Sequence, residues 1–335
     1  MEARKWKTKT SYRYRPINGK PINLGSDLQA AIRRVNDMTG KSKDIGTIGL
    51  LWEQYKESAD WKKLAPKTKP EYISCANQIL KVFSSMYASD ITSYMLYRYL
   101  TEERKNAPVR ANREVSLLSN LIDLAIRRGE AQINPANSVR RNPEQPRHKA
   151  VSTNELSALV DWLSGQEKMP QRKMFAMVAE FTSLCGSRKV ECLDLRWDQI
   201  DEQENVIRLV RAKQRGKRRG EVIDVIAMND SLKDLVSRLK MVKRDDSQHV
   251  FPTTRKGGPH YSPSGFKGMW GKLIAEAIAL KVIEGGFTFH DLRAYYVTQY
   301  KKTHAGVLPD LHSNPATTAR IYDRLVEVNR ESLEK

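Results

Sequence analysis

The spacing of apolar and polar residues predicts a small sheet and a helix at the amino terminus. Tyrosine and arginine alternate in "YRYR" at residues 12–15, and an Asn18-Gly19 pair separates this stretch from "PINLG". Alternation with a period of two on both sides of an Asn-Gly pair predicts a β-hairpin. Ser26 or Asp27 is placed to cap the helix expected in "LQAAIRRV".

From Thr47 to Gly129 the apolar residues recur at helical spacing. Four stretches show this spacing: "TIGLLWEQYKE", "KTKPEYISCANQILKVFSSM", "ITSYMLYRYLTEERK" and "RANREVSLLSNLIDLAIRRG". They predict four helices in a small bundle. The stretch that follows, "PANSVRRNPEQPRHKA" at 135–150, has three prolines and five basic residues and lacks apolar periodicity, so we expect a linker.

The last and largest region mixes helices with a strand pair. Ser152 and Glu155 form a capping-box pattern at its start. Two β-branched stretches, "NVIRLVRA" and "EVIDVIAM", flank "KQRGKRRG" and predict a strand pair joined by a basic turn. The expected helices are 153–164, 170–184, one after Gly186, 229–241, 264–281, 289–302 and one around Tyr322.

These patterns predict a multidomain chain that is mainly α-helical with small β elements. A length of 335 residues exceeds one ordinary core. We expect a small basic β-sheet plus helix at 1–45, a helical bundle at 46–134, the linker at 135–150 and a mixed α/β domain at 151–335.

The charge balance narrows the class of partner. The chain has 58 Lys and Arg against 39 Asp and Glu, a formal net charge of +19. Residues 1–45 alone hold 11 basic and 4 acidic residues. Such an excess predicts a nucleic-acid partner, with a solvated basic surface as the alternative.

Other classes of function find little support. The three cysteines have neither CxxC nor Cys/His ligand spacing, which argues against a disulfide framework or a zinc finger and fits a reducing cytoplasm. No Walker loop or GxGxxG is present, and the most apolar run, "MFAMVAEFTSL", is short and interrupted by Glu180. We therefore expect no cofactor, no metal ion, no membrane span and a cytoplasmic, DNA-associated protein.

Four places in the last region carry candidate chemistry, and two of them are basic. In "CGSRKVE", Arg188 stands where a helix begins, with Glu191 one turn on. It is suited to clamp an anion, although a surface ion pair with Glu191 is the alternative. In "RAKQRGKRRG", Lys213 or Lys217 is suited to reach a phosphate, and solvated loop lysines are the alternative.

The other two places contain histidines. In "FTFHDLRAYYVTQY", His290 and Arg293 fall on one helical face, so both can reach one oxygen-rich ligand. In "DLHSNPATTARIYDR", His312 precedes Tyr322 by ten residues. Taken alone, a His-x-x-Arg motif such as His290 and Arg293 mostly has a structural role, and a tyrosine such as Tyr322 is mostly a half-buried aromatic residue of a helix.

The order and spacing of Arg188, the basic turn, His290-x-x-Arg293, His312 and Tyr322 resemble the tyrosine recombinases, the phage integrase family. The stretches "APKTKPEYISCANQIL" and "STNELSALVDWL" are similar to the core-binding helices and linker of that family, and "VFPTT" and "GFKGMW" to its catalytic domain. The stretch "YRPINGKPINLGSDLQAAI" is similar to the arm-binding sheet of lambdoid integrases. Two features depart from the family pattern: Asp310-Leu311-His312 replaces Leu-Gly-His, and the gap to Tyr322 differs slightly from the commonest one.

The resemblance implies a metal-independent site for DNA cleavage. Arg188 and Arg293 would grip the scissile phosphate, and Tyr322 would attack it to form a 3′-phosphotyrosine. His290 would assist proton transfer, and His312 would hydrogen-bond the phosphate.

The leaving 5′ oxygen would receive its proton from a lysine of the basic turn. We prefer Lys213 to Lys217 because Lys213 lies nearer the end of the first strand. Further expected DNA contacts are Arg13, Arg15, Lys20, Lys67, Arg110, Arg113, Arg215 and Lys217.

The expected partners are double-stranded DNA at core-type and arm-type sites, three further copies of the chain in a homotetramer, DNA-bending accessory proteins and an excisionase. A phage or prophage integrase explains all three domains together. The alternatives are a mobile-element or Xer-like recombinase, and a DNA-binding architectural or regulatory protein that keeps the fold without catalysis. The basic amino-terminal sheet disfavours a chromosome-dimer resolvase and a type IB topoisomerase.

Overall fold

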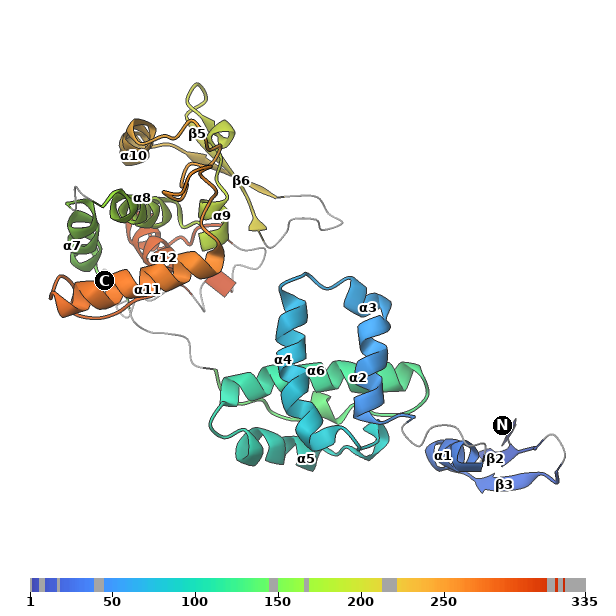
Figure 1. Ribbon diagram of the computed structural model, residues 1–335. Coiled ribbons are helices and arrows are strands. Elements are labelled where there is room, and N and C mark those ends of the chain that lie inside the picture. Colours follow the sequence, from blue (N-terminus) through green and yellow to red (C-terminus); the bar gives the residue numbers. More distant parts are fainter. Residues whose placement is uncertain are drawn as a thin grey trace, which may run out of the picture. The chain divides into compact units, whose positions relative to one another are not determined.

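The computed structural model describes residues 2–5, 10–16, 19–38, 45–144, 150–165, 169–212, 222–311, 317–318 and 322. It divides into two compact units, Met1–Gln145 and Pro146–Lys335. Among the described residues, helices dominate both units, and each unit contains one small antiparallel sheet (Figure 1). The mainly α-helical fold with small β elements is therefore confirmed.

The first unit begins with a three-stranded antiparallel sheet and one helix. The predicted hairpin is present as β2 (Thr10–Tyr14) and β3 (Ile22–Gly25), with Tyr14 opposite Ile22. A further strand, β1 (Glu2–Lys5), pairs with β2 and was not predicted, because its sequence has no apolar alternation. Asp27 precedes α1 (Leu28–Met38), and its Oδ1 accepts a hydrogen bond from the backbone N–H of Ala30 at 3.1 Å.

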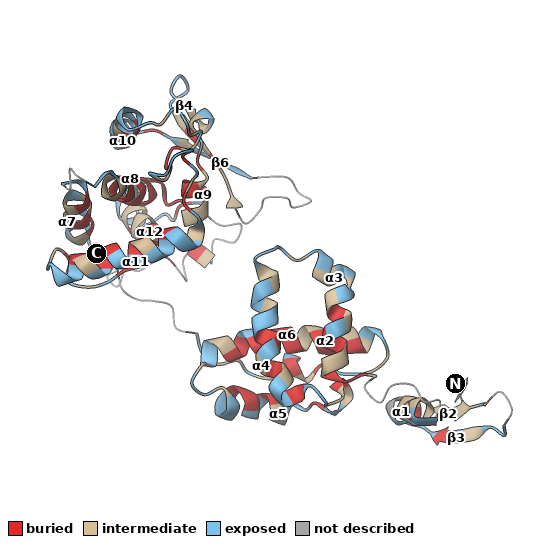
Figure 2. Cartoon of the chain, in the orientation of Figure 1, coloured by how far each residue is buried: buried red, intermediate tan, exposed pale blue. Residues whose placement is uncertain are grey.

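The four predicted helical stretches form a bundle around one long helix. The helices are α2 (Ile48–Glu57), α3 (Ala59–Lys62), α4 (Thr68–Phe83), α5 (Ser93–Arg98) continued by η2 (Tyr99–Glu103), and α6 (Pro108–Arg127), with short turns η1 (Ala88–Asp90) and η3 (Pro135–Asn137). Buried positions line the faces that α2, α4 and α6 turn toward one another (Figure 2). Leu51, Ile79 and Leu118 are fully buried there, so apolar burial holds these helices together.

A buried carboxylate joins α6 to η2. Glu114 is fully buried, and its Oε2 accepts hydrogen bonds from Tyr99 Oη and Arg104 Nε, each at 2.8 Å. Arg104 Nη2 binds the other oxygen at 2.8 Å. Burial, followed by the hydrogen bond to Glu114, raises the pKa of Tyr99, so the phenol stays protonated and donates.

The first part of the predicted linker is anchored to the bundle. Asn142 N donates to Asn112 Oδ1 at 2.9 Å, and Asn112 Nδ2 donates back to Asn142 O at 2.9 Å. Directly before the linker, Asn134 Nδ2 donates to Asp123 Oδ1 on α6 at 2.6 Å. Residues 145–149, which lie at the junction of the two units, are outside the described residues.

The second unit surrounds α8, its most buried helix. Its elements are α7 (Thr153–Ser164), α8 (Pro170–Cys185), α9 (Lys189–Leu193), η4 (Trp197–Gln199), β4 (Ile200–Asp201), β5 (Val206–Val210), β6 (Ile223–Ala227), α10 (Asp230–Met241), α11 (Pro263–Ala279) and α12 (Asp291–Thr303). Phe175, Val178 and Phe181 of α8 are almost completely buried. The predicted strand pair is present as β5 and β6, while the two-residue β4 that extends the sheet was not predicted.

The predicted capping box at the start of α7 is also confirmed. Ser152 Oγ accepts from Glu155 N at 3.1 Å, and Glu155 Oε2 accepts from Ser152 N at 3.2 Å. Of the helices that the structure describes, none has the length and apolar content needed to cross a bilayer.

Candidate active site

The turn after α8 sets the geometry of the site. Gly186 ends α8 in a left-handed conformation, with φ of 62°. A Cβ at this position would lie 2.3 Å from Cδ1 of Tyr296, so only glycine fits. The turn presents the Gly186 carbonyl to Arg293 Nη1, which donates to it, and leads directly into Arg188. One glycine thereby fixes the neighbourhood of both arginines.

Arg188 forms the expected pair with Glu191, but the pair is buried. Arg188 Nη1 lies 2.7 Å from Glu191 Oε1, and Arg188 N donates to Oε2 at 2.7 Å. The side chains are only 14% and 2% exposed, which makes the alternative of a surface pair wrong. Burial raises the pKa of Glu191, but hydrogen bonds from Arg188 outweigh this effect and hold the pKa below its ordinary value.

Glu191 also contacts the beginning of the basic turn. Its Oε1 accepts a hydrogen bond from the backbone N–H of Ala212 at 3.0 Å. Ala212 is the last described residue before Lys213. The Glu191 carboxylate therefore binds both Arg188 and the backbone directly before Lys213.

Arg293 lies on α12 and is 2% exposed. Its Nη2 donates to the Leu311 carbonyl at 3.2 Å, and Arg188 Nη2 lies 3.5 Å from the same oxygen. The two guanidinium groups thus converge on one acceptor. Burial, followed by the charge of Arg188, lowers the pKa of Arg293 to about 10, so it remains protonated at neutral pH. Among the residues that the structure describes, Arg293 Nε has no hydrogen-bond partner.

His290 and Tyr322 meet beside Arg293. His290 directly precedes α12, and its Nε2 lies 2.8 Å from Tyr322 Oη. The two rings have centroids 5.3 Å apart, and Arg293 Cζ lies 5.5 Å from the centroid of the Tyr322 ring. Tyr322 is 7% exposed and packs against Ala294 and Val297 of α12. The phenol is thus held within reach of both an imidazole and a guanidinium.

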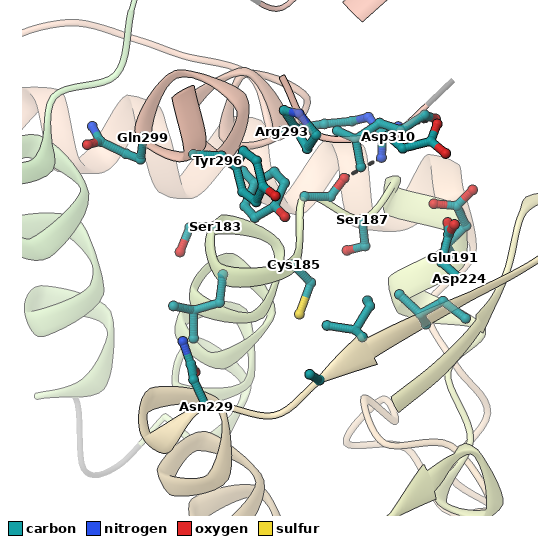
Figure 3. A pocket seen from close by; sticks show the side chains of 18 of the residues that line it. Ser183, Cys185, Ser187, Glu191, Asp224, Asn229, Arg293, Tyr296, Gln299 and Asp310 are labelled. Carbon is teal, nitrogen blue, oxygen red and sulfur yellow. Dashed lines mark hydrogen bonds between the residues drawn. The ribbon is translucent and has the colours of Figure 1, made fainter. Parts of the chain in front are cut away.

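A cavity of about 640 Å³ adjoins these residues. Arg293, Asp310 and Glu191 line it together with Tyr296 and Asp224, and Figure 3 shows Arg293 and Asp310 side by side at its edge. Within the described part of the chain, no three His, Cys, Asp or Glu side chains are grouped so that they would hold a metal ion.

The structure does not describe several of the predicted residues. Lys213, Arg215, Lys217 and His312 lie outside the described residues, as does most of the helix expected around Tyr322. The structure therefore brings together Arg188, His290, Arg293 and Tyr322 of the predicted catalytic set.

The predicted DNA contacts of the first unit lie at its surface or near it. Arg15, Lys20 and Lys67 are exposed, and Arg13 is half-buried in β2. On α6, Arg113 Nη2 lies 3.0 Å from Glu144 Oε2, and Arg110 Nη1 contacts Glu71. The two α6 arginines therefore have acidic partners within the protein.

Sequence reasoning missed a third arginine next to the site. Arg211 follows β5, and its Nε donates to Asp224 Oδ1 at 2.7 Å. Its Nη2 donates to the Asp310 carbonyl at 2.9 Å. The available signal was its position where the predicted strand "NVIRLVRA" runs into the basic stretch "RAKQRGKRRG".

Comparison with solved structures gives the same architecture. A lambda integrase tetramer bound to a Holliday junction is similar, with a TM-score of 0.65 and 18% identity, over 97% of this chain and 96% of that chain. The integrase of transposon Tn1549, residues 82–397, in complex with circular intermediate DNA has a TM-score of 0.65 and 16% identity, over 84% of this chain and 96% of that one. A lambda integrase dimer on a COC′ core site has a TM-score of 0.64 and 18% identity, over 99% and 97%. These similarities show the fold.

A search of curated proteins found no match. The sequence model described as the phage integrase family matches residues 149–327, which is more than half of the chain and contains every predicted catalytic residue. The chain therefore belongs to the phage integrase family, the tyrosine recombinases.

Proposed function

We propose that the protein is a site-specific DNA recombinase, a phage or prophage integrase that cleaves and rejoins DNA through a 3′-phosphotyrosine intermediate. The observation that carries the proposal is the convergence of Arg188 and Arg293 on one oxygen, with the phenol of Tyr322 hydrogen-bonded to His290 beside them. Family membership makes recombination the relevant chemistry, and this geometry supports specific roles.

The two arginines are suited to bind the scissile phosphate. The Leu311 carbonyl accepts from both guanidinium groups and stands in for a phosphate oxygen. An anionic oxygen forms stronger, charge-assisted hydrogen bonds than a neutral carbonyl, so a phosphate would compete well for this position. The guanidinium groups would then stabilise the negative charge that grows on the phosphate oxygens as phosphorus becomes five-coordinate. Because they supply positive charge at that point, the proposal assigns no metal ion to this step.

The phenol and the imidazole supply the nucleophile and its base. A tyrosine phenol has an ordinary pKa near 10 and must lose its proton to attack. His290 Nε2, at 2.8 Å from Tyr322 Oη, is within reach to accept that proton. A bond then forms between Oη and phosphorus, and the bond from phosphorus to the 5′ oxygen breaks.

Two further roles complete the step. We assign the proton for the departing 5′ oxygen to Lys213 and a hydrogen bond to the phosphate to His312. The hydrogen bond from Ala212 to Glu191 supports the assignment of Lys213, because it fixes the preceding residue beside Arg188. Rejoining reverses the step when a 5′ hydroxyl of another strand attacks the phosphotyrosine, so neither ATP nor another cofactor is required.

The proposed substrate is double-stranded DNA. The net charge of +19 suits a polyanion, and the similar lambda and Tn1549 integrases were solved on DNA. We assign core-type sites to 46–134 and 151–335 and arm-type sites to 1–45, with four protomers at the exchanging junction as in the lambda integrase tetramer. Arg15 and Lys20 would contact the arm site, and Lys67 the core site, because all three are exposed. DNA-bending proteins and an excisionase remain proposed partners.

The test is covalent capture on DNA. The full-length protein first selects a core sequence from a randomised duplex pool, and that sequence is then nicked beside the cleavage site so that the cut end diffuses away. We expect an SDS-resistant protein–DNA adduct with the wild type and none with Tyr322→Phe. An adduct of equal yield in Tyr322→Phe would remove Tyr322 as the nucleophile, and DNA binding without any adduct would favour the non-catalytic regulator.

A further inference from the structure

The backbone directly before His312 is held by three arginines. Arg188 and Arg293 donate to the Leu311 carbonyl, whereas Arg211 donates to the Asp310 carbonyl. Two consecutive carbonyls are therefore bound by different arginines. Arg188 and Arg293 have proposed roles at the phosphate, whereas Arg211 has no role so far.

Arg211 is itself rigidly placed. Its side chain is 11% exposed, and Nε and Nη2 both lie 2.7 Å from Asp224 Oδ1. Asp224 belongs to β6 and stands opposite Leu209 of β5. The backbone N–H of Arg211 donates to Val222 O at 2.9 Å, which closes the strand pair just before the basic turn. The guanidinium is thus fixed to the sheet by its main chain and by its ion pair.

The other side of the segment is fixed by packing. Leu311 packs against the apolar cluster that contains Tyr322 and Val297. Leu311 N also donates to Pro309 O at 2.9 Å, which makes a tight turn. The family pattern has glycine where this chain has Leu311. A glycine has no side chain, so the packing of Leu311 against this cluster is a contact that the family pattern lacks.

We propose that Arg211 is a positioning residue, which holds the Asp310 carbonyl to the sheet and so sets the point from which the chain enters His312. The inference rests on the proposed function. A scissile phosphate that binds Arg188 and Arg293 displaces the Leu311 carbonyl, but it does not need Arg211. The bond from Arg211 to Asp310 therefore persists when the Leu311 carbonyl is displaced.

The test separates cleavage from binding in the full-length protein on the selected, nicked core duplex. Arg211→Ala is expected to slow adduct formation at saturating DNA by about tenfold or more, since small misplacements of reacting groups are costly. The half-saturating DNA concentration stays within twofold of the wild type. The matched control is Arg208→Ala, on β5 three residues before Arg211 and also ion-paired, with Asp201 at 3.1 Å. It leaves both quantities within twofold.

Two conservative variants distinguish positioning from simple support of the sheet. Arg211→Lys keeps a charge for Asp224 but lacks the forked N–H groups that also reach the carbonyl, so we expect its rate to stay at least fivefold below the wild type. Asp224→Asn keeps the shape and releases the guanidinium, and its rate should also fall. If Arg211→Ala does not fold, the cleavage rates of these two variants test the positioning role of Arg211.

Full recovery of the rate in Arg211→Lys would overturn the inference, as would a loss confined to the half-saturating concentration. In either case the wild-type adduct still forms, and the proposed function stands. No adduct from the wild type would instead contradict the proposed function, and this inference with it.

Discussion

Arg188, which directly precedes α9, and Arg293 on α12 are 105 positions apart in the numbering and donate to the same carbonyl oxygen, that of Leu311, at 3.5 and 3.2 Å. Two like charges approach each other only where an acceptor or an anion offsets their repulsion. Glu191 offsets the charge of Arg188 at 2.7 Å, whereas the described acceptors of Arg293 are the backbone carbonyls of Gly186 and Leu311. The arrangement therefore favours an anion over the neutral oxygen that it holds.

Replacement of either arginine by lysine should abolish most cleavage and spare most DNA binding. Lysine keeps the charge but loses the planar fork that can bind two phosphate oxygens. By analogy with other oxyanion stabilisers, we expect a loss of about 100-fold or more in the rate of adduct formation at saturating DNA. Single-turnover assays on the nicked core duplex measure this rate. Rates within threefold of the wild type in both Arg188→Lys and Arg293→Lys would contradict the phosphate-binding role.

Glu191→Gln should destabilise the second unit and slow cleavage. The amide keeps the shape of the carboxylate but leaves the buried charge of Arg188 without its counterion, which typically costs about 3 kcal/mol. Urea unfolding monitored by fluorescence gives the free energy of unfolding. Glu202→Gln is the matched control, because both side chains of its pair with Lys240 are exposed to solvent, and the change should cost less than about 1 kcal/mol. Equal costs for the two variants would show that burial of the Arg188 pair is unimportant.

The stability difference between the wild type and Glu191→Gln should depend on pH. Because the folded-state pKa of Glu191 lies below its ordinary value of 4.5, the carboxylate stabilises the fold fully above that value. Its contribution is lost as the pH falls through the lowered folded-state pKa. We therefore expect a constant difference between about pH 6 and 8 and a shrinking one below about pH 4.5. A difference that grows on acidification would reverse the assigned direction.

The elements of the fold followed from short-range patterns. The strand pair β5 and β6 and the capping box at Ser152 depend on residues near one another in sequence, so period and capping chemistry predicted them. The strands β1 and β4 were missed because their pairing partners, and not their own composition, make them strands.

The candidate site was predicted only through the combination of motifs. Spacing placed His290 and Arg293 on one helical face. It also allowed a pair of Arg188 with Glu191, but only as an alternative at the surface, whereas the pair is buried. The contact between Arg211 and Asp310 joins positions 99 apart. No local pattern encodes such a contact, because it depends on how the sheet packs against the segment after α12.

Removal of residues 1–45 should separate two classes of DNA site. We expect the truncated protein to form the adduct on the core duplex at a rate near that of the full chain, because all the proposed catalytic residues lie in the second unit. Binding to a second, distal class of sequence selected by the full chain should be lost. Mobility-shift titrations with both duplexes measure this. Undiminished binding of the truncated protein to every selected sequence would refute the arm-type role of 1–45.

Gly186→Ala should destabilise the second unit more than an alanine at another left-handed glycine. The left-handed backbone alone costs an L-residue about 1–2 kcal/mol. At Gly186 the new methyl would also lie 2.3 Å from the Tyr296 ring, and overpacking adds about 1–3 kcal/mol. Gly306→Ala is the matched control, with φ of 85° and no atom within 4 Å of its Cβ position. Urea unfolding of both variants isolates the contact with Tyr296. Equal losses would mean that the ring moves aside at little cost, and the turn would then not be what fixes Arg188 and Arg293.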